Sequence, residues 1–266
     1  MKVVACIIAR TVSTRLPLKV LRNISDQISI LDFLIMRLKL VNSIDEIYLC
    51  TSKEEVDDIL EDVAIKHNIK IYRGSADNVI ERMLDVGEIA KADFLLRITG
   101  DNPLTSYEWV DKQYEFIVDK ELDYVRLIDV PIGATAEIMT FSALKKCYQS
   151  INPGVSEYLM LFLFEPRSFK CGVIKPFEED YSYISITVDL KKDLVRTKSI
   201  LSHFKEPLSV SLEQIIGTIK ANNIPDAFFK ATGEIKMPYG KSISFDDFRE
   251  DMKRRVDNSA KLSLYE

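Results

Sequence analysis

A short segment rich in cationic and hydroxyl side chains, residues 10–19, carries the clearest chemical signal in this chain. Arg10, Arg15 and Lys19 lie there among three hydroxyl residues, directly behind an apolar run, with no carboxylate between them. Guanidinium groups bind phosphoryl oxygens through paired hydrogen bonds, and the lysine ammonium supplies a point charge to the same oxygens. The segment therefore predicts a site for a phosphorylated ligand, although composition alone also leaves open an ordinary solvated basic loop.

Two aspartates follow other strand-like runs. Asp101 comes shortly after the run 94–98, and Asp189 comes directly after the run 183–188. Ligands of open parallel sheets bind beyond the carboxyl ends of the strands, so we expect both carboxylates at the same edge as the basic segment. Carboxylates that hold Mg²⁺, beside cations that bind a triphosphate, are what nucleotidyl transfer requires. Taken singly, each aspartate has the simpler explanation of a turn or a helix cap.

The elements that must position these residues alternate in type along the first half of the chain. Strands are predicted at 3–9, 46–51, 70–72 and 94–98, and helices at 30–40, 54–66 and 77–90. Ser29 is the expected N-cap of the first helix, and Ser75 or Asp77 that of the third. This alternation requires right-handed crossovers and predicts an α/β fold with a mostly parallel sheet.

After about residue 105 the alternation loosens. Helices are predicted at 107–118, 142–149, 191–203, 211–221 and 245–256, and strands at 124–127, 137–141 and 183–188. Ser211 is the expected cap of the helix that follows it. The apolar segment 156–164 has a helical pattern and could cover a cleft or a partner.

The composition argues against several classes of partner. Hydrophobic residues make up 47% of the 266-residue chain, and the formal net charge is −5, with cations spread along the sequence. This balance speaks against a general binder of nucleic acid or of anionic membranes. No apolar run reaches transmembrane length, and Arg10 interrupts the N-terminal apolar stretch too early for a secretory signal, so we expect a cytoplasmic location. The four cysteines lack metal-ligand spacing, which predicts buried, reduced thiols and no zinc site.

The residues of the basic segment, read together with those around them, resemble a known family. The stretch 7–21 is similar to the opening motif of the cytidylyltransferases, in the branch of the spore coat polysaccharide biosynthesis protein F type, which is related to the acylneuraminate and 3-deoxy-manno-octulosonate cytidylyltransferases. The resemblance continues through Thr51-Ser52, Arg73-Gly74-Ser75, Asp77-Asn78-Val79, the stretch 96–104, Thr187-Val188-Asp189 and Asp193-Leu194. It follows the chain in order over roughly the first 220 residues.

The resemblance implies a three-layer, Rossmann-like fold of the nucleotide-diphospho-sugar transferase type, with a mixed, mostly parallel sheet. It also implies CTP as co-substrate, Mg²⁺ as cofactor and a homodimer. By motif position, the catalytic residues would be Arg10, Arg15, Lys19 and Asp101. The basic residues Arg10, Arg15 and Lys19 would bind CTP together with Ala9, Ser13, Thr14, Ser52, Arg73 and Thr99. The metal would be held by Asp101 and Asp189. Arg73 and the backbone near Ala9 would lie by the cytosine and ribose. We expect a nucleotidyltransferase domain at 1–222 and a helical extension at 223–266 that packs on it or on a partner.

The implied reaction is attack of an acceptor oxyanion on the α-phosphorus of CTP, with release of pyrophosphate. The acceptor would be a sugar acid or another anionic small molecule, for surface polysaccharide or glycan synthesis; a non-sugar phosphorylated metabolite is the alternative. A glycosyltransferase that uses a nucleotide sugar is expected to carry an Asp-x-Asp motif, and none follows the run 94–98.

Three single residues and one short stretch depart from the family pattern. The family usually has glycine at Val12, and this branch usually has glycine at Leu18, where glycine lets the backbone approach phosphate and adopt a positive φ. The branch tends to carry aspartate at Thr135, and Arg-Glu-His at 156–158, where this chain has Ser-Glu-Tyr. These departures leave open a degenerate, non-catalytic member that binds nucleotide.

Overall fold

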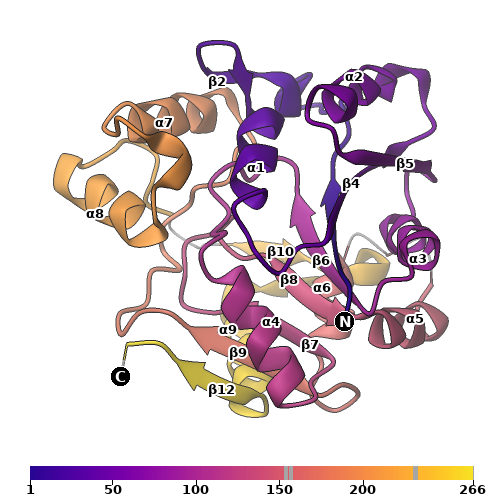
Figure 1. Ribbon diagram of the computed structural model, residues 1–266. Helices are drawn as coiled ribbons and strands as arrows, with labels where there is room; N and C mark the ends of the chain where they lie inside the picture. Colours follow the sequence, from indigo (N-terminus) through magenta and orange to yellow (C-terminus); the bar gives the residue numbers. More distant parts are fainter. Residues whose placement is uncertain (153–154, 156–157, 230–232, 266) are drawn as a thin grey trace.

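A mixed eight-stranded sheet forms the centre of the molecule (Figure 1). The computed structural model describes residues 1–152, 155, 158–229 and 233–265. The strands are β1 (Val3–Ile8), β4 (Glu46–Ser52), β5 (Lys70–Gly74), β6 (Phe94–Thr99), β7 (Tyr124–Leu127), β8 (Glu137–Thr140), β9 (Cys171–Lys175) and β12 (Ala260–Ser263). Their order is β12-β9-β7-β8-β6-β1-β4-β5, and only β8 runs antiparallel to its neighbours in this sheet. The prediction of a mostly parallel, mixed sheet is confirmed.

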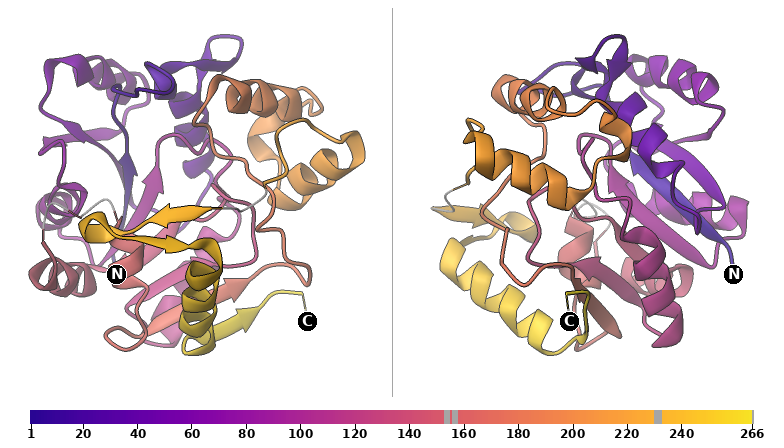
Figure 2. Two further views of the ribbon diagram at one scale, coloured as in Figure 1. Left: turned by 180° about the vertical axis from the view of Figure 1, so that it is seen from behind. Right: turned by 60° about the vertical axis from the view of Figure 1, so that its left-hand side comes forward.

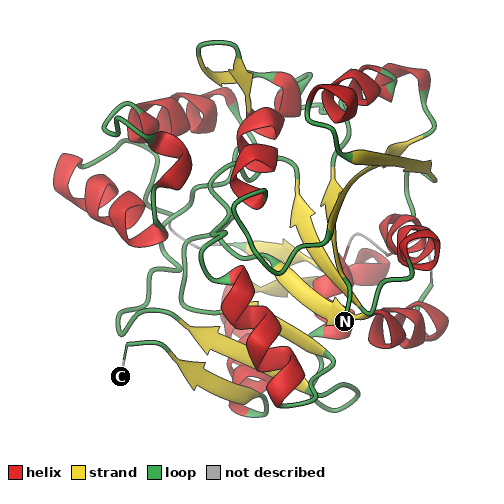
Figure 3. Cartoon of the chain, in the orientation of Figure 1, coloured by secondary structure: helices red, strands yellow, loops and turns green. Residues whose placement is uncertain are grey.

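The sheet lies between two layers of helices, which completes the predicted three-layer α/β fold (Figure 3). The helices are α1 (Ile30–Leu38), α2 (Ile59–Lys66), α3 (Val79–Ala90), α4 (Val110–Asp119), α5 (Phe141–Ser150), α6 (Leu159–Leu163), α7 (Lys191–Leu201), α8 (Leu212–Asn222) and α9 (Phe245–Asp257). Among the described residues, no helix is long and apolar enough to cross a membrane.

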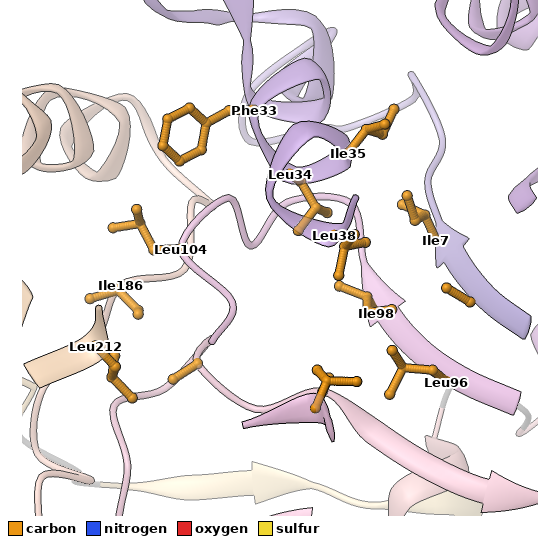
Figure 4. Close-up of a cluster of buried hydrophobic side chains, with 14 of the residues drawn as sticks. Ile7, Phe33, Leu34, Ile35, Leu38, Leu96, Ile98, Leu104, Ile186 and Leu212 are labelled. Carbon is orange, nitrogen blue, oxygen red and sulfur yellow. The ribbon is translucent and has the colours of Figure 1, made fainter. Parts of the chain in front are cut away.

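Alternating side chains of the strands supply two hydrophobic clusters, one on each face of the sheet. Along β1, Val3, Ala5 and Ile7 join one cluster, and Val4 and Cys6 join the other, because successive side chains of a strand point to opposite faces. Helices α1, α2, α4, α7 and α8 contribute to the first cluster, and α3, α5, α6 and α9 to the second. Figure 4 shows part of the first cluster, where side chains of α1 lie beside those of β1 and β6. All four cysteines are buried and free, as predicted.

The helix caps agree in part with prediction. Ser29 accepts a hydrogen bond from the backbone of Asp32 and caps α1, and Ser211 caps α8 in the same way. The N-cap of α3 is neither Ser75 nor Asp77. Asn78 takes that place, because its side chain accepts from the backbone N–H of Glu81, while Ser75 accepts from Asn78 one turn earlier.

The predicted strand at 183–188 is wrong. The segment makes only isolated bridges in the described structure, Ser185 with Ile132 and Ile184 with Phe228. Its alternating apolar residues are buried as the pattern requires. Its backbone N–H groups bond instead to loop carbonyls, including Ser185 to Ala227 and Ile186 to Ile132. β9, for which the sequence analysis makes no prediction, pairs with β7 in the main sheet.

The segment after residue 222 contains more than the predicted helix. A hairpin of β10 (Glu234–Lys236) and β11 (Ser242–Ser244) precedes α9, which confirms the helix predicted at 245–256, and β12 then joins the edge of the main sheet beside β9. Figure 2, seen from behind, shows the hairpin and α9 lying over the face opposite α1 and α4. The boundary at 222 stays a prediction. A second hairpin, β2 (Asn23–Ser25) with β3 (Ile28–Ser29), leads into α1.

Candidate active site

The basic segment forms a loop at the carboxyl end of β1, and a buried aspartate fixes its start. The backbone N–H and the hydroxyl of Thr11 both donate to Asp57 Oδ1 at 2.7 Å, and the Ser52 hydroxyl donates to the other oxygen. Burial raises the pKa of Asp57, but these hydrogen bonds outweigh it and hold that pKa below its ordinary value. The loop closes where Leu18 N–H donates to the Thr11 carbonyl at 3.2 Å. Asp57 therefore anchors the loop as a charged group, a role that the sequence analysis did not assign.

Four of the predicted charged residues meet at this edge. Lys19 Nζ lies 2.6 Å from Asp101 Oδ2 and 2.9 Å from Asp189 Oδ1, and Arg15 Nη2 lies 2.8 Å from the same Asp189 oxygen. Burial lowers the pKa of Lys19, but Asp101 and Asp189 outweigh this effect and hold it above its ordinary value. The segment has no carboxylate of its own, so the fold supplies two from distant parts of the chain.

Two close backbone contacts bring the carboxylates together. The N–H of Gly100 donates to the carbonyl of Ile8 at 2.8 Å, and a Cβ at Gly100 would lie 2.8 Å from Ala9 Cβ. Glycine is thus needed directly after β6, where the backbone lies against the end of β1. The N–H of Val188 then donates to the Asp101 carbonyl at 3.1 Å, which places Asp189 beside Asp101 although 183–188 forms no strand.

The turn that carries Asp189 has its own supports. Asp193 Oδ2 accepts from the backbone N–H groups of Asp189 at 3.0 Å and Leu190 at 2.8 Å. The buried Arg196 donates to Asp193 Oδ1 at 3.1 Å and to the Asp226 carbonyl at 2.7 Å. Burial lowers the pKa of Arg196. Asp193 is in the motif that the resemblance uses, but nothing in the sequence distinguishes Arg196 from a surface cation.

The donor set at this edge suits magnesium. Asp101 and Asp189 both reach one ammonium group, so one cation can contact both carboxylates. Within the described ranges, no group of three or more His, Cys, Asp or Glu side chains has the arrangement of a metal site. Mg²⁺ is commonly held by one or two carboxylates together with substrate phosphates and water, so two aspartates beside the cations of this loop fit it.

The remaining residues predicted on the loop and on β6 lie along the same edge. Arg10 donates to the Ala76 carbonyl at 3.0 Å, and its Nη1 lies 3.9 Å from Asp77 Oδ1. Ser13 accepts from the Leu16 N–H at 3.2 Å, and Thr14 is exposed. The buried Ala9 donates to the Cys50 carbonyl at 3.2 Å, and Thr99 accepts from the Asn102 side chain at 2.6 Å.

Arg73 and Ser52 take part in a second group of contacts, at the ends of β5 and β4. Arg73 donates to the carbonyls of Ser52 and Glu54, both at 3.0 Å. Its guanidinium also pairs with Asp58 at 2.5 Å and Glu61 at 2.6 Å. The resemblance implies that Arg73 lies by the cytosine. In this structure its guanidinium already has four acceptors, which leaves it little capacity to bind a base.

Leu18 and Val12, the two loop positions where the family usually has glycine, differ in backbone conformation. Leu18 has φ 55° and ψ 31°, the left-handed conformation that favours glycine. Val12 is 58% exposed and is not among the residues with positive φ, so its branched side chain causes no such strain. Thr135 accepts from Leu127 N–H at 3.1 Å and donates to the Ala136 carbonyl at 2.9 Å. Of the stretch 156–158, residues 156 and 157 lie outside the described residues.

Comparisons with known proteins identify relatives that are similar in sequence and in fold. A family model described as cytidylyltransferase matches residues 4–158. Spore coat polysaccharide biosynthesis protein SpsF of Bacillus subtilis is 30% identical over 237 residues, which cover 82% of this chain and 93% of that protein. A cytidylyltransferase structure from Leptospira borgpetersenii serovar Hardjo-bovis, 29% identical, superposes with a TM-score of 0.79 over 86% of this chain and 99% of the other. CMP:2-keto-3-deoxy-manno-octonic acid synthetase complexed with CTP, 17% identical, shares the fold, with a TM-score of 0.60 over 76% and 99% of the two chains.

Proposed function

Because the chain belongs to the cytidylyltransferase family and is thus a CTP-using nucleotidyltransferase, we propose that it joins CMP to a sugar acid or another anionic small molecule and releases pyrophosphate. The product would serve surface polysaccharide or glycan synthesis, as the name of the Bacillus subtilis relative suggests. Mg²⁺ is the proposed cofactor.

One observation carries the proposal: two cations and two carboxylates within hydrogen-bond distance of one another at the carboxyl edge of the sheet. A triphosphate at this edge would meet Lys19 and Arg15 as cations, while Asp101 and Asp189 would hold the metal. Bound magnesium would supply positive charge against the charge that develops on the departing pyrophosphate. The side chains would orient the α-phosphorus for in-line attack.

The reaction needs no protein nucleophile. An oxygen of the acceptor forms the new bond to the α-phosphorus, and the bond from that phosphorus to the pyrophosphate oxygen breaks. The work of the protein is therefore positioning and charge stabilisation, which the clustered charges of the loop and the two aspartates can provide.

The contacts of Thr135 favour a second candidate for the acceptor. Its hydroxyl bonds to the backbone of Leu127 and Ala136, at a position where this branch tends to carry a carboxylate. The position thus lacks a negative charge that would repel an anion. An acceptor that carries its own phosphate, including a non-sugar phosphorylated metabolite, is therefore the second candidate.

Pyrophosphate release tests the proposal. We would incubate the protein with Mg²⁺ and each of the four nucleoside triphosphates, against sugar acids, phosphorylated sugars and phosphorylated amino acids. We expect release with CTP and one acceptor class, and its loss on removal of Mg²⁺. Asp101→Asn should slow turnover by about 100-fold or more, since electrostatic contacts at the reacting group contribute on this scale.

Asp93→Asn is the matched control, because Asp93 precedes β6 while Asp101 follows it, and Asp93 contacts the backbone of Lys2 instead. Its turnover should stay within about threefold of the unmodified protein, as expected for a surface change. Equal rates for Asp101→Asn and Asp93→Asn would contradict the site assignment. A panel without any CTP-dependent release or CTP binding would contradict the function.

A further inference from the structure

A row of three charged residues crosses the sheet where β8 lies between β6 and β7 (Figure 1). Arg97 of β6 pairs in register with Glu137 of β8, and Arg126 of β7 pairs with the same Glu137 on its other side. The residues two positions away on these strands belong to the second hydrophobic cluster: Leu95, Tyr124 and Met139. Because side chains alternate along a strand, the three charged side chains lie on that same face.

The single carboxylate of this row has no capacity for the second arginine. Glu137 is 5% exposed, its Oε2 accepts from Arg97 Nη1, and its Oε1 accepts from the Tyr124 hydroxyl. Burial raises the pKa of Glu137, but the charges of Arg97 and Arg126 outweigh it and hold that pKa below its ordinary value. Burial and the nearby Glu137 raise the pKa of Tyr124, so the phenol stays neutral. Two cations against one anion leave the row with one uncompensated positive charge.

Both guanidinium groups are held in place and still have free donors. Arg126 Nε donates to the Leu127 carbonyl at 3.3 Å, and its guanidinium lies 5.7 Å from the centre of the Phe164 ring. In the described part of the chain, Arg97 Nη2 and the two terminal nitrogens of Arg126 have no oxygen acceptor. The Arg97 side chain is 17% exposed and Arg126 is half-buried, so solvent reaches both. Fixed, accessible donors on a net positive row are suited to an anion.

The row lies close to the candidate active site but is separate from its cations. Thr99 follows Arg97 by two residues in β6, so the two side chains share a face, and Asp101 follows directly after the Gly100 contact. Four residues of chain from Arg97 to Asp101 span at most about 14 Å. Lys19 already lies against Asp101, on the side where the triphosphate is proposed to bind. One small molecule can therefore reach from the reacting phosphorus to the row.

We infer that Arg97 and Arg126 bind an anionic group of the acceptor, a carboxylate or a phosphate, that lies apart from the oxygen that attacks CTP. This inference rests on the proposed function and narrows its substrate class to acceptors with an anionic group remote from the reacting oxygen. The two guanidiniums donate paired hydrogen bonds to that group, and it compensates the excess charge of the row. A neutral acceptor leaves both the charge and the donors without a partner, so it binds more weakly.

Nuclear magnetic resonance of the arginine side chains tests the inference without turnover. The Nε–H of Arg97 is buried and that of Arg126 donates to a carbonyl, so we expect both to exchange slowly enough with water to be observed. Arg97→Lys and Arg126→Lys assign the two signals. With Mg²⁺ and saturating CTP present, at constant ionic strength, we would titrate inorganic phosphate in one series and acetate in another. We expect saturable shifts of both signals, and the anion that binds more tightly identifies the group as phosphate or carboxylate.

Arg126→Met is the variant that decides the role of the row, because Glu137 keeps its contacts with Arg97 and Tyr124. It should weaken binding of the preferred anion by about 10-fold or more, the expected loss of charged hydrogen bonds. With an acceptor found by pyrophosphate release, it should raise the KM for that acceptor by about 10- to 100-fold and leave the KM for CTP within about threefold.

Arg249→Met is the matched control. Arg249 also lies over a phenylalanine, 5.2 Å from the centre of the Phe245 ring, but on the exposed side of α9. Its replacement removes the same stacked guanidinium and should leave the anion affinity and both KM values unchanged.

Three results would overturn the inference while the proposed function stands. They are the absence of a saturable shift with either anion, an unchanged anion affinity in Arg126→Met, and a loss of CTP affinity in Arg126→Met, which would assign the arginine to the nucleotide. Absence of CTP binding by the unmodified protein would instead contradict the proposed function. If Arg126→Met fails to fold, the titration of the unmodified protein decides the question, since it depends on no variant of the row except for signal assignment.

Discussion

At the scale of single residues, Leu18 shows a local conflict between sequence and backbone. Its φ of 55° lies in the left-handed region, where a side chain with a Cβ costs about 1–2 kcal/mol. The conformation persists because the loop is tied at both ends: Leu18 bonds to Thr11, and Leu21 N–H donates to the Leu18 carbonyl at 2.9 Å. The loop therefore forms without glycine, but at lower stability.

Leu18→Gly should raise the free energy of unfolding by about 0.5–1 kcal/mol, since relief of strain exceeds the extra chain entropy of glycine. The leucine side chain is 44% exposed, so little packing is lost. Urea denaturation followed by circular dichroism measures the change. Val12→Gly is the control and should lower stability slightly, because Val12 does not adopt a positive φ. A loss of stability in Leu18→Gly would refute the strain argument.

The sequence predicts the charged site well and its supports poorly. Lys19, Asp101 and Asp189 were predicted to meet, because strand ends converge at one edge of a parallel sheet, and they do. Asp57 and Arg196 were missed. The type of a charged residue does not reveal whether its side chain is buried, because burial depends on partners that only the folded chain brings near.

At the scale of elements, Asp32 joins α1 to the end of α2. It accepts from the backbone and hydroxyl of Ser29 in the cap of α1, and it pairs with Lys66 at 2.9 Å and with His67. Burial raises the pKa of Asp32, but the hydrogen bonds from Lys66, Ser29 and His67 outweigh it and lower that pKa from 3.8 to about 2. The ionised form is therefore the one that the fold stabilises.

This linkage gives a pH dependence with a definite sign. The lowered pKa contributes about 2 kcal/mol to the free energy of unfolding above the unfolded-state pKa, and the contribution is lost as pH falls from about 4 to 2. Asp32→Asn should thus be less stable at neutral pH, and the two proteins should converge in stability toward pH 2. Urea titrations at several pH values measure this. The control is Asp26→Asn, an exposed change that should leave the pH dependence of the free energy of unfolding as it is in the unmodified protein. If Asp32→Asn and the unmodified protein lost stability in parallel as pH falls, that result would contradict the linkage.

The prediction of helices succeeded where the spacing of apolar residues determines which face of the helix packs on the core. The helices α1, α3, α7, α8 and α9 start within two residues of prediction and end within two. The error at 183–188 has a different cause: alternation reports which side chains are buried, and it does not report whether a neighbouring strand is there to pair. The short β9, with a glycine among five residues, has too little pattern to be recognised.

At the scale of the whole molecule, Arg255 holds the C-terminal helix against the main body. This buried side chain of α9 donates to the carbonyl of Leu161 at 2.7 Å and to that of Phe164 at the end of α6. Its Nε also donates to Asp251 at 2.6 Å within the helix. The guanidinium of Arg255 thus supplies hydrogen-bond donors to two backbone carbonyls at α6.

Arg255→Ala should lower the free energy of unfolding by about 1–3 kcal/mol, because it leaves buried carbonyls without a partner. Limited proteolysis should also cut the segment after residue 222 faster in this variant. Lys253→Ala, an exposed change on the same helix, should match the unmodified protein in both assays. Unchanged proteolysis in Arg255→Ala would indicate that α9 is held mainly by its apolar contacts.

The central place of β1 in the sheet also sets the kinetics of folding. Val4 pairs with Glu46, and Val3 pairs with Phe94, so the middle of the sheet joins segments far apart in the chain. Closing such long loops costs chain entropy before any strand contact compensates for it, so we expect this protein to fold more slowly than one built mainly from local contacts. Since Asp101 comes two residues after β6, we expect the charge contacts of Lys19 with Asp101 and Asp189 to form only when this pairing is complete.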